Sequence, residues 1–85
     1  MARGRPPTVF VRPLSNEEER ELAGLIWRGR RNTSSVAWRR ALVVWRSARG
    51  AAATEISRTC GSTPDRVREV IHRFNRDGTA SLAPR

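Results

Sequence analysis

The most constraining feature of the sequence is a sharp corner between two apolar-patterned runs. The stretch TEISRTCGSTPDRVREVIHRF breaks at Gly61 and resumes at once as a second, longer run. Glycine permits the positive φ that such a corner requires. Before it, residues 53–59 have room for about two helical turns. The sequence therefore predicts a short helix that is followed directly by a tight glycine turn.

The run after the corner carries several signals for a helix over residues 63–77. Thr63 is suited to cap the helix, and Asp65 complements the positive end of its dipole. Pro64 can take the first helical position, where its missing N–H costs nothing. Gly78 then ends the pattern. Helical spacing is kept by the apolar residues Val67, Val70, Ile71 and Phe74.

Two more helices are predicted before the corner. The segment LSNEEERELAGLIWRG contains a capping box, formed by Ser15 and Glu18, and Gly29 is expected to end this helix. The second helix, within RRNTSSVAWRRALVVWRSARG, is expected to begin after Thr33 or Ser34 and to end at Gly50. The predicted fold class is therefore all-α, a small bundle of about four helices.

The domain boundaries follow from where the helical pattern begins and ends. Residues 1–13 carry prolines and arginines without helical periodicity, so a flexible basic arm is predicted there. Residues 14–78 are predicted to form one domain, and residues 79–85 a flexible tail. A chain of 85 residues has room for one such domain and not two.

A short helix, a glycine turn and a second helix with one apolar and one polar side predict a helix-turn-helix. The second helix of this motif enters the major groove of DNA, where its N-terminal half contacts bases. An arginine there can hold guanine through two hydrogen bonds, and a carboxylate can accept from cytosine or orient an arginine. The predicted base-contacting residues are Thr63, Asp65, Arg66, Arg68 and Glu69.

The net charge also favours a nucleic-acid partner. The chain contains 17 arginines and no lysine, against 8 acidic residues, which gives a net charge of +9. Seven of the arginines lie between Arg28 and Arg49, where no acid occurs. So high a charge on a small chain indicates a polyanionic partner. No apolar run approaches the roughly 20 residues of a membrane helix, and a membrane partner is not expected.

Arginines outside the base-contacting face are assigned to phosphates or to the minor groove. Arg3-Gly4-Arg5-Pro6 is the core of an AT-hook-like element, which fits a narrow minor groove; a disordered basic leader is the alternative. The arginines that follow the first helix could clamp phosphate or belong to a solvated loop. The full predicted set is Arg3, Arg5, Arg30, Arg31, Arg39, Arg40, Arg73 and Arg76.

Other chemistry has little support in the sequence. A single cysteine excludes an internal disulfide and a cysteine-based metal site, and Cys60 is interpreted as a small core residue. His72 has no ligand partner at suitable spacing, so no catalytic residue, metal, cofactor or small-molecule substrate is predicted. The three tryptophans, Trp27, Trp38 and Trp45, are interpreted as mostly core residues.

Three stretches resemble the N-terminal DNA-binding region of bacterial insertion-sequence transposases, the prokaryotic branch of the mariner superfamily. They are RPLSNEEERELAGLI, RRNTSSVAWRRALVVWRSARG and TEISRTCGSTPDRVREVIHRFNRDGTASLAPR. The resemblance covers residues 12–85, and DRVREVIHRFNRDG followed by SLAPR is its most specific part. It implies a homeodomain-like helical domain that binds the terminal inverted repeats of the element.

The resemblance also implies a catalytic domain downstream, with an RNase-H-like fold and three carboxylates that hold two metal ions. The given chain stops at Arg85, so it is expected to lack those carboxylates and to be no enzyme alone. It is therefore predicted to be the recognition part of a transposase, in the bacterial cytoplasm on the nucleoid. Four acidic residues lie inside the helix-turn-helix and cannot take the catalytic roles: Glu55, Asp65, Glu69 and Asp77.

Three residues depart from the pattern of such motifs. Ser57 stands where alanine is preferred, Ser62 where a buried apolar residue is preferred, and Ala52 at the place of a helix cap. A buried hydroxyl without a partner costs about 1–3 kcal/mol. Lower stability with an unchanged fold is the expectation.

Two other functions stay open. A free-standing helix-turn-helix transcriptional regulator would carry the same motif and bind a promoter site instead of a transposon end. A small basic RNA-binding or protein-interaction module is the other, although the sequence lacks the aromatic platform or glycine loop of common RNA-binding domains. Double-stranded DNA is the expected partner, and a homodimer is compatible with the sequence.

Overall fold

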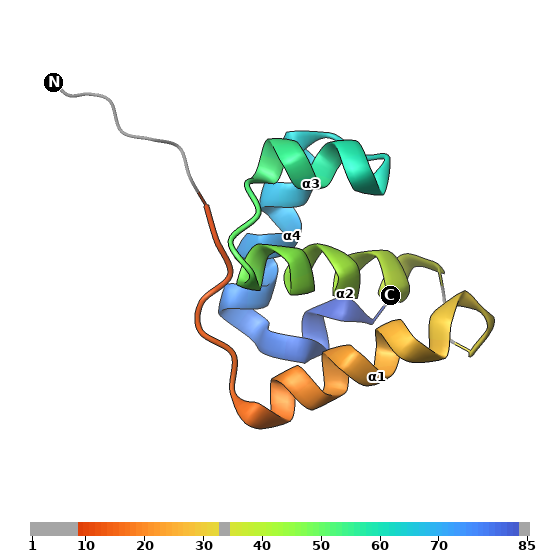
Figure 1. The fold of residues 1–85 in the computed structure, drawn as a ribbon. Helices are drawn as coiled ribbons and strands as arrows, with labels where there is room; N and C mark the ends of the chain where they lie inside the picture. The colour runs from red at the N-terminus through yellow and green to blue at the C-terminus, as the bar shows by residue number, and fades with distance from the viewer. Residues whose placement is uncertain (1–8, 33–34, 84–85) are drawn as a thin grey trace, which may run out of the picture.

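The computed structural model describes residues 9–32 and 35–83, and within these ranges the fold is all-α (Figure 1). The predicted fold class and the four expected helices are confirmed, and a short 3₁₀ helix follows them. The elements are α1 (Asn16–Asn32), α2 (Ser35–Ala48), α3 (Ala53–Cys60), α4 (Pro64–Asp77) and η1 (Gly78–Leu82).

The first helix begins and breaks at the residues that the sequence indicates. The Ser15 Oγ accepts from the Glu18 N–H at 3.1 Å, and the Glu18 Oε1 accepts from the Ser15 N–H at 3.0 Å, which is the predicted capping box. Gly29 breaks the helical geometry with φ 72° and ψ −172°. The backbone of α1 nevertheless continues to Asn32, three residues further than predicted.

The corner between α3 and α4 has the expected backbone conformation. Gly61 lies in the left-handed region, with φ 65° and ψ 42°, and its N–H donates to the Ser57 carbonyl. The Thr63 Oγ1 accepts from the Arg66 N–H at 3.2 Å, and Pro64 takes the first position of α4. The hydroxyl of Ser57 is buried but donates to the Thr54 carbonyl at 2.7 Å. The expected cost of an unpaired hydroxyl at Ser57 therefore does not arise.

The hydrophobic core draws on all four helices and on η1. Phe74 is completely buried, and the aliphatic side of α4 faces inward as predicted, with Val70 partly buried at its edge. Burial of each large side chain contributes roughly 1.5–3 kcal/mol. The largest fully buried side chains are those of Phe74, Leu22, Ile56, Ile71, Leu82, Val44 and Val67.

The expectation that all three tryptophans lie in the core is wrong for one of them. Trp38 and Trp45 are half-buried, but the Trp27 side chain is 84% exposed. The reason is helical geometry, because one further residue turns the side chain by about 100°. Ile26 packs against the core, so its neighbour Trp27 points past the edge of the buried stripe.

Residues 9–13 belong to the folded domain and not to a flexible arm, which corrects the prediction for this segment. Val11 is buried, and its N–H donates to the Ser47 Oγ at 2.9 Å. The Asn75 amide binds the backbone twice, since its Oδ1 accepts from the Arg12 N–H at 2.8 Å and its Nδ2 donates to the Phe10 carbonyl at 3.1 Å. Polar side chains of α2 and α4 thus form hydrogen bonds with the backbone N–H and C=O groups of this extended segment.

The side chain of Arg12 ties this segment to two helices. Its guanidinium donates to both carboxylate oxygens of Glu18, at 2.9 and 2.7 Å, and lies 5.0 Å from the centroid of the Phe74 ring. The hydrogen bonds from Arg12, and then that from the Ser15 N–H, lower the pKa of Glu18 to about 2. Arg12 therefore joins the start of α1 to α4.

The predicted flexible tail is likewise ordered over most of its length. Leu82 is buried, and η1 packs against α4 and α2. The Arg40 Nη1 donates to the carbonyls of Ser81 and Ala83, at 3.3 and 3.1 Å, and lies 3.5 Å from that of Leu82. The tail is thus fastened by a buried leucine and by an arginine from α2. Residues 84–85 lie outside the described residues.

Replacing Glu18 by Gln should lower the free energy of unfolding by about 1–2 kcal/mol at neutral pH, discounted for the partial exposure of the ion pair. The folded pKa of about 2 lies below the ordinary value of 4.5, so this stabilisation is present above pH 4.5 and is lost as the pH falls toward 2. Urea unfolding between pH 2 and 7 measures the difference. Glu19→Gln, at an exposed position of the same helical turn that forms no ion pair with a described residue, is the matched control and should change the free energy of unfolding little. If the free energy of unfolding of both variants varied with pH in the same way, the stabilisation could not be assigned to the Arg12–Glu18 ion pair.

Replacing Arg40 by Ala should lower the free energy of unfolding by about 1–2 kcal/mol, because the carbonyls at the end of η1 lose a charged donor. Arg39→Ala removes the same charge from a neighbouring exposed position and should stay within about 0.5 kcal/mol of the wild type. Urea midpoints at high salt, where surface charges are screened, measure both variants. A pair of variants with the same midpoint would show that Arg40 does not hold η1.

Candidate nucleic-acid interface

The side of α4 opposite the core is continuous and polar. Because Val67, Ile71 and Phe74 are buried, the residues on the opposite side of the helix face solvent. Four of the predicted base-contacting residues are exposed, whereas Arg68 is partly buried. The exposed side carries Asp65, Arg66, Glu69, His72, Arg73 and Arg76.

Three of the four arginines of α4 are paired with acids of the same helix. Arg68 Nη1 lies 3.0 Å from Asp65 Oδ1, and Arg73 Nη2 lies 3.5 Å from Glu69 Oε2. The third pair joins Arg76 to its neighbour Asp77 at 3.4 Å. Solvent-exposed pairs of this kind contribute only about 0–1 kcal/mol. A phosphate or a base edge can therefore replace the acid at little cost.

Arg68 is the most constrained of these arginines. Its side chain is 31% exposed, whereas that of its partner Asp65 is 96% exposed. The Arg68 Nε is buried and has no hydrogen-bond partner among the described residues. The aliphatic part of the Arg68 side chain thus lies against the domain, and Asp65 binds the end of its guanidinium. The side chain is already restricted before a ligand binds, so less conformational entropy is lost on binding.

The other residues of the predicted base-contacting set differ in what they offer. The Thr63 Oγ1 accepts from the Arg66 N–H, which leaves the hydroxyl hydrogen available to a ligand. The Arg66 side chain makes no ion pair with any residue in the described ranges. Glu69 is shared with Arg73. The structure thus places all five residues on the first two turns of α4 or at its cap.

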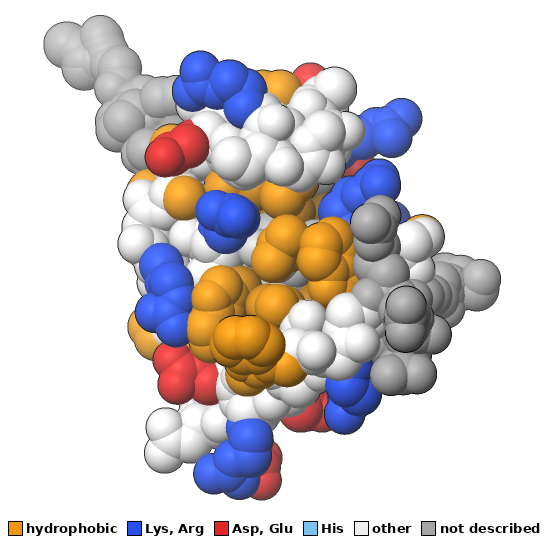
Figure 2. All heavy atoms as spheres, turned by 45° about the vertical axis from the view of Figure 1, so that its right-hand side comes forward, with side chains coloured by type: hydrophobic (Ala, Val, Ile, Leu, Met, Phe, Trp, Pro, Cys, Tyr) orange, Lys and Arg blue, Asp and Glu red, His pale blue; other side chains and the backbone are white. Residues whose placement is uncertain are grey.

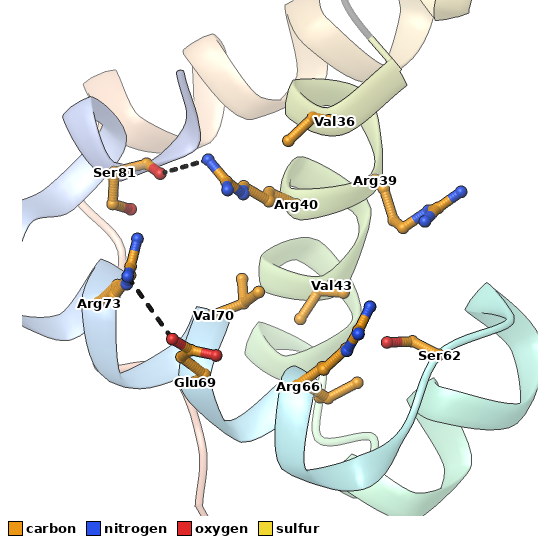
Figure 3. Close-up of a pocket in the computed structure, with 11 residues that line it drawn as sticks. Val36, Arg39, Arg40, Val43, Ser62, Arg66, Glu69, Val70, Arg73 and Ser81 are labelled. Atoms are coloured by element: carbon orange, nitrogen blue, oxygen red, sulfur yellow. Dashed lines mark hydrogen bonds and ion pairs between the residues drawn. The ribbon is translucent and has the colours of Figure 1, made fainter. Parts of the chain in front are cut away.

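A groove of about 460 Å³ lies beside this helix, between α4 and α2 (Figure 3). Its walls include the aliphatic side chains of Val36, Val43 and Val70. In the close-up, Arg40 points toward Ser81 at one end, and Arg66 lies toward the end at which Ser62 is found. Four arginines line the groove: Arg39, Arg40, Arg66 and Arg73.

Two valines of this groove, Val36 and Val43, were not predicted from the sequence, whereas Val67 and Val70 were. Val36 and Val43 are seven residues apart and so fall on one side of α2, which is a signal that the sequence does contain. Ser62 also lines the groove and is partly buried, although an apolar residue was expected to be preferred there. A groove between two helices depends on their packing, which periodicity alone does not give.

The arginines predicted to contact phosphate differ in their exposure and in their hydrogen bonds. Arg39, Arg73 and Arg76 are exposed and accessible. Arg40 is partly buried and its Nη1 donates to the carbonyls of η1, so only Nε and Nη2 remain for the phosphate contact, which stays a prediction. The side chains of Arg30 and Arg31 lie outside what the structure describes. The same is true of Arg3 and Arg5.

The described ranges contain no group of three or more His, Cys, Asp or Glu side chains that could hold a metal ion. No helix within these ranges has both the length and the apolar character needed to cross a membrane.

Comparison with known proteins agrees with this geometry. Residues 34–83 match the model of a homeodomain-like domain, and the matched segment contains α2, α3, α4 and η1. Comparison with curated proteins and with solved structures gives no match. A homeodomain is a three-helix variant of the helix-turn-helix, and the motif is a DNA-binding unit. The family model covers more than half of the chain, and the protein therefore belongs to the homeodomain-like helix-turn-helix family.

Proposed function

We propose that the protein binds double-stranded DNA sequence-specifically, with the N-terminal half of α4 in the major groove. One observation carries this proposal. α4 buries Val67, Ile71 and Phe74 directly after the Gly61 turn, and its opposite side exposes Arg66, Arg73 and Arg76 to solvent. A major groove about 12 Å wide admits such a helix.

The proposed contacts divide the arginines between bases and phosphates. Arg68, held by Asp65, is suited to guanine, because a bidentate contact needs a guanidinium of fixed orientation. Thr63, Arg66 and Glu69 are proposed to contact neighbouring bases. Phosphate contacts are proposed for Arg39, Arg73 and Arg76, which are exposed on α2 and further along α4.

The N-terminal segment supports a further contact in the same proposal. Asn75 of α4 holds the backbone of Phe10 and Arg12, so the chain enters the domain next to this helix. Arg3 and Arg5 precede Phe10 by only a few residues, and we propose that they enter the adjacent minor groove of the DNA. Arg30 and Arg31 are proposed as additional phosphate contacts.

Among DNA-binding functions, we propose recognition of the terminal inverted repeats of an insertion sequence, as part of a transposase. This step is supported by the resemblance of residues 12–85 to that family, whose most specific stretch, DRVREVIHRFNRDG, forms most of α4. A free-standing transcriptional regulator is equally compatible with the fold. The sequence selected from a pool of random duplexes separates the two, because it matches either inverted repeats or a promoter.

Replacing Arg68 by Ala should relax the preference at one base pair, with a loss of about 1–3 kcal/mol of discrimination there. Arg39→Ala should weaken binding to all duplexes alike, because a phosphate contact carries no sequence information. Binding-site selection from a random duplex pool measures both effects. Circular dichroism should show that both variants fold. Indistinguishable selection profiles for the two variants would contradict this division of roles.

The affinity for duplex DNA should fall steeply with salt, with a log–log slope of about −0.9 per phosphate contacted. Arg39→Ala should make that slope shallower by about 1, whereas Arg68→Ala should leave it nearly unchanged. Titrations of a labelled duplex between about 50 and 200 mM salt measure the slopes. A duplex RNA competitor in the same assay tests the RNA-binding alternative. A slope near zero, or stronger displacement by RNA than by DNA, would overturn the proposal.

A further inference from the structure

The chain contains a single histidine, His72, and it is exposed on the side of α4 that faces away from the core. The proposed base and phosphate contacts do not include it. His72 lies between Glu69, which is proposed to contact a base, and Arg73, which is proposed to contact phosphate. Its imidazole therefore borders both sets of proposed contacts.

His72 forms one line with two arginines along the surface of α4. Arg68 precedes it by four residues and Arg76 follows it by four, and side chains at this spacing are neighbours on one side of a helix. Both arginines are paired with an acid of the same helix. The side chain of His72 forms neither a hydrogen bond nor an ion pair with a described residue. Its ring is thus available to a ligand.

The positive charge of the chain otherwise comes from arginine. Figure 2 shows arginine side chains spread over one face of the domain, around a central group of hydrophobic side chains. All 17 basic residues of the sequence are arginines. Arginine keeps its charge throughout the pH range in which proteins are studied, whereas histidine is the residue type that gains a proton between about pH 8 and pH 5. His72 is therefore the residue of α4 whose type allows the charge of this helix to change near neutral pH.

Four charged residues of α4 surround His72. Arg73 is the next residue, and Arg68, Glu69 and Arg76 lie about one turn away. Glu69 is shared with Arg73, at 3.5 Å. Three arginines and one acid thus set the charge around the ring on its own helix.

The elements packed against α4 are α2, α3, η1 and the segment 9–13. η1 carries no charged residue, Arg12 binds Glu18, and Arg40 binds the carbonyls of η1. The remaining charged residues of these elements are Arg39, Arg46, Glu55 and Arg58. None of them forms an ion pair with His72. A phosphate that approaches this side of α4 therefore meets a ring that no described acid already holds.

We propose that His72 contacts a DNA phosphate in its protonated form, so that DNA binding by α4 becomes tighter as the pH falls from about 7.5 to about 5.5. This inference rests on the proposed function, because the phosphate belongs to the duplex that α4 enters. The protonated ring has two N–H donors, whereas the neutral ring has one. A phosphate beside the ring favours the protonated form, since opposite charges attract. Binding and proton uptake are therefore coupled at this residue.

The position of His72 along α4 favours a phosphate over a base edge. The helix begins at Pro64, so His72 is its ninth residue and lies beyond the half that is proposed to contact bases. Later turns of such a helix approach the sugar–phosphate backbone. The neighbouring cations Arg73 and Arg76 are already paired with acids of α4. His72 thus adds a cation that has no acid to leave when it binds phosphate.

The affinity of the full chain for a labelled duplex selected from the random pool, measured at about pH 5.5 and pH 7.5 and at equal ionic strength, tests the proposal. Carboxylates and thiols ordinarily titrate outside this range. The wild type should bind about two- to fivefold more tightly at the lower pH, as expected for one exposed ion pair. The log–log salt slope should also be steeper there by about 0.9, because one more phosphate is contacted.

Two variants fix the charge at this position. His72→Gln should remove the pH dependence and bind at both pH values about as tightly as the wild type at the higher pH. His72→Arg, with a constant charge, should bind at both pH values about as tightly as the wild type at the lower pH. Arg39→Ala is the matched control, since it should weaken binding but keep the pH dependence. Glutamine and arginine are good helix formers, and circular dichroism at both pH values checks that each chain folds.

The outcomes separate this inference from the proposed function. If the wild type binds DNA with the same affinity and salt slope at both pH values, His72 contacts no phosphate, while the proposed function stands. The inference is also wrong if His72→Gln keeps the full pH dependence, or if the wild type binds more weakly at the lower pH. Absence of binding to any duplex at either pH would overturn the proposed function and, with it, this inference.

Discussion

The left-handed backbone at Gly61 is the constraint on which the DNA-binding arrangement depends. It allows α4 to leave α3 within three residues, so that Ile56 of α3 and Val67 of α4 enter the same core. Apart from the two adjacent residues of the chain, nothing lies within 4 Å of the place a Cβ would take at this glycine, so the restriction comes from its φ of 65° and not from crowding. A longer or straighter connection would let α4 rotate, and its arginine-bearing side would no longer be fixed by the burial of the opposite side.

The electrostatics of α4 differ from those of the whole chain. The chain has a net charge of +9, but α4 carries four arginines against three acids, and three of those arginines are already paired. A helix that is nearly neutral gains little from non-specific attraction to phosphate, so under the proposed function most of that attraction comes from arginines outside α4, such as Arg39. The exposed acids of α4 would add specificity chiefly by repulsion, because a duplex that places a phosphate close to Asp65 or Glu69 brings two like charges together.

What could be predicted from the sequence is the set of features that depend on local geometry. The capping box at Ser15, the cap at Thr63 and the positive φ at Gly61 each follow from residues a few positions apart. The anchoring of residues 9–13 and of η1 depends on contacts between positions far apart, such as Val11 with Ser47 and Arg12 with Asn75. The candidate site followed the same division, because the exposed side of α4 could be predicted from helical spacing and the groove against α2 could not.

The two buried serines show how polar residues are used inside this small core. Ser57 donates to the carbonyl of Thr54 on its own helix, and Ser47 accepts from the N–H of Val11. An alanine in place of Ser57 would leave no backbone group without a partner. An alanine in place of Ser47 would leave the N–H of Val11, in an extended backbone, without its acceptor. Ser47 therefore specifies where residues 9–13 dock, and Ser57 is tolerated because its hydrogen bond offsets its burial. The departure at Ser57 thus leaves the helix-turn-helix intact.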